Sequence, residues 1–103
     1  MNYEPERVIE TEEIREKLLN FIIDNFHVEM ADIKLDESLM DTGIIDSLGL
    51  IEILAFFEEE FSVVTGEEQM TKENLGSVNR MVDYVQRERE RMFAGTASGQ
   101  AGR

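Results

Sequence analysis

The sequence contains no cysteine and a single histidine, His27. Without cysteine the chain can form neither a disulfide framework nor a thiolate metal site, so any thiol chemistry must come from another molecule. One imidazole leaves no second histidine for a zinc site, and a serine triad would depend on His27 alone. We therefore expect no catalytic residues, no bound metal and no enzyme activity of the chain's own.

Basic residues are also few. The chain has 10 Lys plus Arg against 23 Asp plus Glu, and its formal net charge is −13. Such a surface repels the phosphates of nucleic acids and of anionic lipids, and it attracts proteins that display basic patches. The other explanation is simple solubility, and composition alone does not separate the two. Nucleic acid is in either case excluded as an expected partner.

Long apolar runs are missing as well. No stretch approaches the ~20 apolar residues that span a bilayer, and the N-terminal segment 1–6 lacks the basic and apolar regions of a signal peptide. We therefore expect a cytoplasmic protein without a transmembrane segment. The 103 residues suffice for one small domain, whose core has room for a few short helices or strands. We expect it to be a monomer.

Apolar residues at helical spacing predict a first long helix from Thr11 to Phe26. Thr11 can cap this helix, and Glu12 and Glu13 in its first turn are favoured by the positive end of the helix dipole. The next stretch, 28–43, has no sustained period and is rich in turn-forming residues, which indicates a long loop. Apolar side chains spaced through this loop should hold it against the core, namely Ile33, Leu35, Leu39 and Met40.

A second helix is predicted from Asp46 to Phe61, because the segment has no proline and Asp46 is a good capping residue. Successive residues turn by about 100° around a helix, which places one apolar face toward the core. That face consists of Leu50, Ile53, Leu54, Phe57 and Phe61. The opposite side mixes apolar and acidic groups where a merely solvated face would be polar, which favours contact with another protein. It consists of Leu48, Ile51, Glu52, Ala55, Glu58 and Glu59.

Two further helices complete the predicted fold. The linker 62–70 should contact the core through Val63 and Val64, and a short helix is expected at 71–75. Ser77 can cap a last helix with an apolar stripe, whose charged run 86–91 indicates a solvated face. The fold class is therefore all-α, a small up-and-down four-helix bundle with three long helices and one short one. The domain should span residues 8–93, between a flexible lead at 1–7 and a disordered tail at 94–103.

Asp46-Ser47-Leu48 lies where the predicted loop meets the second helix. A serine hydroxyl at a helix start lies near free backbone N–H groups and the positive end of the dipole, a setting that tolerates an attached phosphate. For an isolated Asp-Ser pair, plain helix capping is the commoner explanation. The dipeptide alone does not decide between the two.

The residues around it carry a resemblance. The sequence Leu-Met-Asp-Thr-Gly-Ile-Ile-Asp-Ser-Leu at 39–48, the acidic helix after it, and Asp-Tyr-Val at 83–85 closely resemble the phosphopantetheine attachment region of acyl carrier proteins and their peptidyl and D-alanyl relatives. The similarity extends from about Val8 to Glu88. It implies that Ser47 carries a 4′-phosphopantetheine arm, which a phosphopantetheinyl transferase moves from coenzyme A with magnesium. Asp46 and Leu48 flank the serine in the same motif, and the thiol of the arm accounts for a chain without cysteine.

The resemblance also implies a function and partners. It predicts a non-catalytic acyl carrier protein that holds acyl intermediates as thioesters and presents them, through the second helix, to acyl-loading and acyl-processing enzymes with basic patches. Ile44, Ile45 and Gly49 differ from the pattern of primary fatty-acid synthesis, so we expect a specialised lipid or secondary-metabolite pathway. An aminoacyl, D-alanyl or peptidyl cargo stays open. So does a regulatory or scaffolding module of the same fold that has lost the modification.

Overall fold

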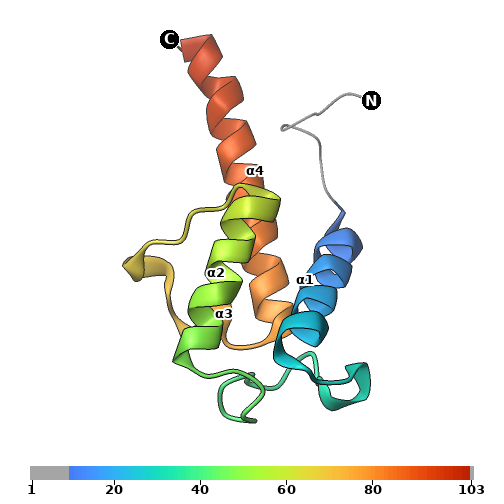
Figure 1. Cartoon of the computed structure of the whole chain (residues 1–103). Helices are drawn as coiled ribbons and strands as arrows, with labels where there is room; N and C mark the ends of the chain where they lie inside the picture. The colour runs from blue at the N-terminus through green and yellow to red at the C-terminus, as the bar shows by residue number, and fades with distance from the viewer. Residues whose placement is uncertain (1–9, 103) are drawn as a thin grey trace.

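The structure is a computed structural model that describes residues 10–102, with side chains described from residue 10 to residue 92. The predicted lead at 1–7 lies outside this range, as does Arg103. Within it every secondary-structure element is a helix or a 3₁₀ turn, which confirms the all-α bundle with three long helices and one short one (Figure 1). The elements are α1 (Thr11–Phe26), a 3₁₀ turn (Met30–Asp32), α2 (Ser47–Phe61), a second 3₁₀ turn (Glu67–Gln69), α3 (Lys72–Leu75) and α4 (Val78–Gly102).

Helix α1 has the predicted bounds, but its N-terminal cap residue differs from the predicted one. Thr11 is its first helical residue, and Glu10 occupies the cap position without a side-chain hydrogen bond. The prediction that Thr11 caps the helix is therefore wrong. Glu12 and Glu13 do lie in the first turn, where the dipole favours their charges. The helix ends at Phe26 and is followed by the cap residue His27, whose backbone is left-handed (φ 57°) and whose N–H donates to the carbonyl of Ile23.

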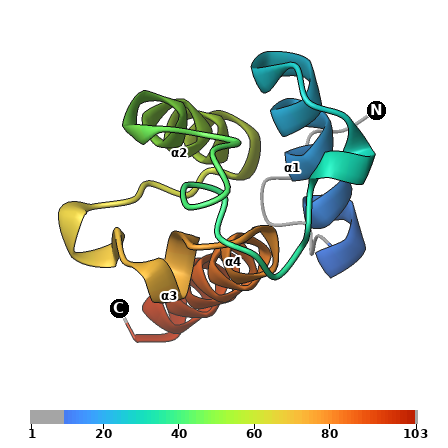
Figure 2. The ribbon, with the colours of Figure 1, turned by 90° about the horizontal axis from the view of Figure 1, so that it is seen from below.

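Each long helix turns one apolar face into a common core. Figure 2 shows α1, α2 and α4 around that core, with the loop 27–46 crossing between them at the near end. α2 contributes Ile53, Phe57 and Phe61, which are fully buried, while Leu50 and Leu54 pack against them from the edge. Burying one such side chain fully is worth about 1.5–3 kcal/mol. The fully buried side chains of the other two helices are Ile14, Leu18 and Ile22 in α1, and Val78, Met81, Val82, Tyr84 and Val85 in α4.

The crossing loop is held to the rest of the bundle by its backbone and by most of the predicted apolar contacts. The N–H of Leu39 donates to the carbonyl of Gly76 at 3.1 Å, and the carbonyl of Leu35 accepts from Asn79 at 3.0 Å. Ile33 and Leu39 are buried, and Leu35 packs against the core. Met40 is 44% exposed, so the prediction that it contacts the core is wrong. It occupies the turn after Leu39, and only one of the two neighbours can point inward.

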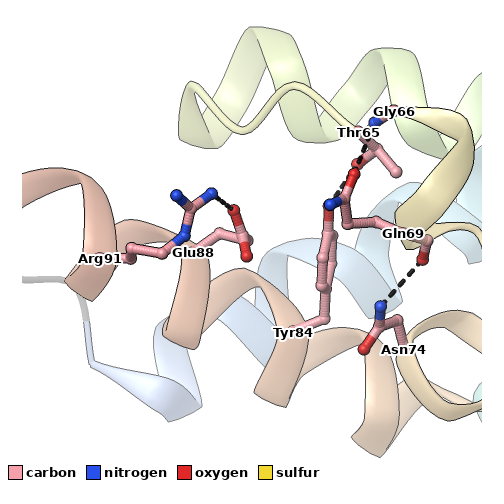
Figure 3. A network of polar contacts seen from close by, with 7 residues as sticks. All are labelled: Thr65, Gly66, Gln69, Asn74, Tyr84, Glu88 and Arg91. Atoms are coloured by element: carbon pink, nitrogen blue, oxygen red, sulfur yellow. Dashed lines mark hydrogen bonds and ion pairs between the residues drawn. The ribbon is translucent and has the colours of Figure 1, made fainter.

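In the linker between α2 and α3, too, one of two neighbouring apolar residues is buried and the other is exposed. Val63 is buried as predicted, whereas Val64 is 72% exposed and makes no core contact. A non-helical chain crossing a core surface turns one of two consecutive side chains inward and the other outward. Thr65, the next residue, accepts a hydrogen bond from the buried Tyr84 hydroxyl of α4 at 2.9 Å (Figure 3). The linker is thus held to the bundle by the buried Val63 side chain and by the hydrogen bond from Tyr84 of α4.

Helix α4 is capped by Ser77, whose hydroxyl accepts from the N–H of Arg80 at 3.2 Å, as predicted. The helix continues to Gly102, through the segment where the sequence predicts a disordered tail, and its last turns extend past the bundle (Figure 1). The boundary of the domain at residue 93 stays a prediction. Over the described residues, none of the helices combines the length and the apolar composition that crossing a bilayer requires.

The charged run of α4 is not uniformly solvated. Arg89 is only 6% exposed, and its Nη1 donates to the backbone oxygen of Phe61 at 2.5 Å. The last carbonyls of a helix have no partner within the helix, so this guanidinium satisfies one of them at the end of α2. The prediction of a solvated face is wrong at this position. Arg89 lies four residues after Val85 and therefore on the buried side of α4.

Candidate functional site

Ser47 is the first residue of α2, and its side chain is exposed. Asp46 caps the helix, because its carboxylate oxygen Oδ1 accepts a hydrogen bond from the N–H of Gly49 at 2.8 Å. Within the described part of the chain, the Ser47 hydroxyl has no hydrogen-bond partner. The capping explanation of the Asp-Ser pair therefore applies to Asp46 alone. Ser47 is left with a free hydroxyl at the start of a helix.

The surroundings of Ser47 suit an attached phosphate. The first backbone N–H groups of a helix have no acceptor within the helix, and Asp46 satisfies only that of Gly49. Among the described residues, the N–H groups of Ser47 and Leu48 have no acceptor and are available at the start of the helix. The positive end of the dipole of this 15-residue helix adds to the attraction of a negative group. A phosphodiester on Ser47 would be solvent-exposed and electrostatically favoured.

The residues around Ser47 that differ from the pattern of primary fatty-acid synthesis are explained by packing, which the sequence alone does not reveal. Ile45 is buried and Ile44 is packed against the core, so this pair anchors the end of the loop. Gly49 is buried as well. A Cβ atom at Gly49 would lie 3.0 Å from Cε1 of Phe26, and 3.1 Å from Cβ of Ile45. Phe26 is thus part of the setting of Ser47, although it is 21 positions away in the sequence.

The side of α2 that faces away from the core is exposed along its whole length. Leu48 is 73% and Ile51 53% exposed, so two large apolar side chains lie on this side, one helical turn apart. The remaining members of this side are also exposed, namely Glu52, Ala55, Glu58 and Glu59. We call these six residues the outer face of α2. The helix contains no basic residue, so the charge of this face is purely negative.

The glutamates of α2 differ in their surroundings. Glu60 forms an ion pair with Lys17 of α1, with 3.0 Å between Nζ and Oε2. Within the described residues, Glu52, Glu58 and Glu59 form no ion pair. The outer face therefore presents its charge to the solvent, whereas the charge of Glu60 is partly neutralised inside the protein.

A cavity of about 210 Å³ lies beside the first turn of α2. It is bounded by the loop, α2 and α3, and its apolar walls come from Met40, Leu50, Met70 and Leu75. Leu50 is three residues after Ser47, so one wall of the cavity continues the turn that carries the serine. Asp41 and Lys72 add one charge of each sign to the lining.

A family model for the phosphopantetheine attachment site matches residues 16–85, from α1 to the buried half of α4. The chain belongs to the phosphopantetheine-binding carrier proteins. It is a carrier protein and not an enzyme, and the cofactor of the family is a covalently bound 4′-phosphopantetheine. When bound, this group supplies the thiol on which a cargo is held as a thioester. The fold, the free hydroxyl and the absence of cysteine all agree with that role.

Several curated relatives of the carrier protein are D-alanyl carrier proteins. That of Streptococcus uberis is 32% identical over 72 residues, which cover 70% of this chain and 90% of the relative. That of Streptococcus suis is 26% identical over 73 residues, which cover 71% of this chain and 91% of the relative. An acyl carrier protein of Clostridium acetobutylicum is 31% identical over 70 residues, which cover 68% and 88% respectively. The carrier protein is thus similar to both subgroups, and it extends beyond the matched region at both ends.

Proposed function

We propose that Ser47 is the residue that carries the 4′-phosphopantetheine arm. The observation that supports this most strongly is that Asp46, and not Ser47, caps α2. The Ser47 hydroxyl is exposed and forms no hydrogen bond with the described residues. A hydroxyl already engaged in capping would be a poorer acceptor for the transferred group. The dipole of α2 favours the phosphodiester at the same place.

The experiment is incubation with coenzyme A, magnesium and a broad-range phosphopantetheinyl transferase, followed by intact mass measurement. The wild-type protein should gain the mass of one phosphopantetheine group, and Ser47→Ala should gain nothing. Ser62→Gly is the matched control. It removes an exposed serine from the other end of α2, and glycine accepts the left-handed backbone there (φ 63°). A protein that gains no mass would be the regulatory or scaffolding module considered above.

The outer face of α2 is the surface we propose for partner enzymes, the transferase included. Its unpaired glutamates attract proteins with basic patches and speed their encounter. Its two exposed apolar residues, Leu48 and Ile51, offer the kind of contact that is buried at the centre of an interface. Leu48 follows the serine directly, so a partner bound to this face would have the arm within reach.

For the cargo, the names of the relatives favour a D-alanyl group. An acyl intermediate of a specialised lipid or secondary-metabolite pathway, as expected from the residues around Ser47, is the second candidate, and the similar acyl carrier protein supports it. The cavity of about 210 Å³ beside the first turn of α2 has mainly apolar walls and offers a place for a short cargo.

The two cargoes differ in a direct measurement, the mass of the group bound to the protein isolated from its host. A D-alanyl group on the arm supports the first candidate. A fatty or polyketide acyl group supports the second. In either case the group should be released by hydroxylamine, as a thioester is, and should be missing from Ser47→Ala.

A further inference from the structure

The ring of Phe26 and Cβ of Ile45 crowd the position that a Cβ atom at residue 49 would occupy. Phe26 is the last residue of α1, and Gly49 is in the first turn of α2, two residues after Ser47. A Cβ atom at Gly49 would be 3.0 Å from Cε1 and 3.3 Å from Cζ of that ring. Such distances are shorter than ordinary carbon contacts, so even a methyl group would push the ring or the turn aside.

Phe26 is held in place by other aromatic rings. It packs edge to face on Phe21, with 6.1 Å between the ring centroids and 79° between the planes. Phe21 in turn stacks on Phe56 of α2, with 4.4 Å between centroids and 22° between the planes. Phe56 lies seven residues after Gly49 and so on nearly the same side of α2. The end of α1 therefore contacts α2 at two points, one of them in the turn that carries Ser47.

Gly49 has a second role in the same turn. Its N–H donates a hydrogen bond to the Asp46 carboxylate, at 2.8 Å. Glycine weakens a helix relative to alanine, so its presence in the first turn needs a reason. The close approach of the Phe26 ring supplies one. The cap and the ring both act on Gly49, and together they restrict the movement of the first turn.

We propose that Phe26 is a positioning residue for Ser47. Through its contact with Gly49, it fixes the first turn of α2 and hence the direction in which the Ser47 hydroxyl leaves the bundle. This inference rests on the proposed attachment of the arm at Ser47. Phe26 does not touch the transferred group. It presents the hydroxyl to the transferase in one orientation, and its loss changes the transfer step more than the docking of the enzyme.

The test uses Phe26→Leu, Gly49→Ala and the double variant, with the full chain and steady-state kinetics of phosphopantetheine transfer from coenzyme A. Displacement of a reacting group by about 1 Å can cost up to about 100-fold in rate, so each single variant should lower kcat by about tenfold or more, with KM little changed. The double variant should recover only part of the loss, because leucine relieves the crowding with the ring of Phe26, whereas Cβ of Ile45 stays 3.1 Å from the added methyl group. Tyr84→Phe is the control, since it removes a hydrogen bond far from Ser47.

A second measurement does not depend on the transferase. Amide hydrogen exchange of Gly49 in the unmodified protein should speed up at least about tenfold in Phe26→Leu, and should stay at the wild-type rate in Tyr84→Phe. Wild-type kcat in both folded single variants would overturn the proposal, and so would unchanged protection of Gly49. If the wild type accepts no phosphopantetheine, the proposed function fails, while the exchange measurement still decides whether Phe26 holds the turn.

Discussion

Arg89 of α4 donates from Nη1 to the backbone oxygen of Phe61 at 2.5 Å and so satisfies a carbonyl at the C-terminal end of α2. It lies beyond residues 16–85, the span that the family model matches. The helix that carries the proposed arm is therefore stabilised at both ends. Asp46 and Phe26 act at its start, and a guanidinium from the last helix acts at its end.

Replacement of Arg89 should destabilise the fold. Arg89→Met keeps the apolar stem and leaves the Phe61 carbonyl without its donor, which costs about 1–3 kcal/mol. In a domain of this size, Tm falls by roughly 4–8 °C for each kcal/mol, so thermal unfolding followed by circular dichroism resolves the effect. Arg87→Met is the matched control, because the Arg87 side chain is exposed and bonds only Asn74 among the described residues. Equal changes in the two variants would contradict a specific role of Arg89.

The cap of α2 gives a prediction that separates charge from hydrogen bonding. Asp46→Ala removes the acceptor of the Gly49 N–H and should lower the free energy of unfolding by about 0.5–2 kcal/mol. Asp46→Asn keeps an acceptor oxygen and should lose only a small part of that. Denaturant unfolding measures both. If the two variants are equally destabilised, the negative charge of Asp46 matters more than its hydrogen bond.

The outer face of α2 should determine the affinity for partners. Glu58→Gln together with Glu59→Gln should raise KM for the transferase several-fold and leave kcat nearly unchanged, because the variant loses only electrostatic attraction. The effect should shrink at high salt, where charges at the surface are screened. Glu60→Gln is the control, since Glu60 is already paired with Lys17. The control removes one charge and the double variant two, so a rise of KM in the control that is half as large on a logarithmic scale would mean that net charge is responsible, and not the outer face.

The excess of acidic residues should make the stability depend on salt. With a formal net charge of −13, the carboxylates of the folded chain repel one another. Among the described residues, ion pairs join Glu12 with Arg15, Glu60 with Lys17 and Glu88 with Arg91, which leaves most of the negative charge uncompensated. Added salt or divalent cations should therefore raise Tm in a thermal scan. A Tm that stays constant from low to high salt would mean that local contacts compensate the repulsion.

The sequence predicts the helices and most of the core, because the period of apolar residues follows directly from helix geometry. It predicts less in the loops, where one of two neighbouring apolar residues is buried and the other exposed. Val63 and Val64 are both valines, and only the path of the linker buries the first and exposes the second. Met40 is exposed for the same reason. The burial of Arg89 could have been predicted from its position four residues after Val85, but a charged residue in a charged run is normally expected to be exposed.

The site shows a similar division. Asp46 and Ser47 can be placed at the start of a helix from the sequence, and the outer face follows from helical projection. Which of the two residues caps the helix depends on backbone geometry, and the structure assigns the cap to Asp46. The contact of Phe26 with Gly49 joins the end of one helix to the start of another, and no local pattern contains it. In the sequence, Gly49 is therefore only a difference from the pattern of primary fatty-acid synthesis, whereas in the fold it lets the ring of Phe26 approach the backbone.

The most direct test of the account is to locate the modification itself. After loading with coenzyme A and the transferase, tandem mass spectrometry of the peptide that contains residue 47 should place one phosphopantetheine on Ser47 and on no other residue. Loss of the modification from Ser47→Ala, with the exposed Ser62 of the same helix unmodified in both proteins, is the predicted result. A phosphopantetheine found on another residue, or an equal load on Ser47→Ala, would contradict it.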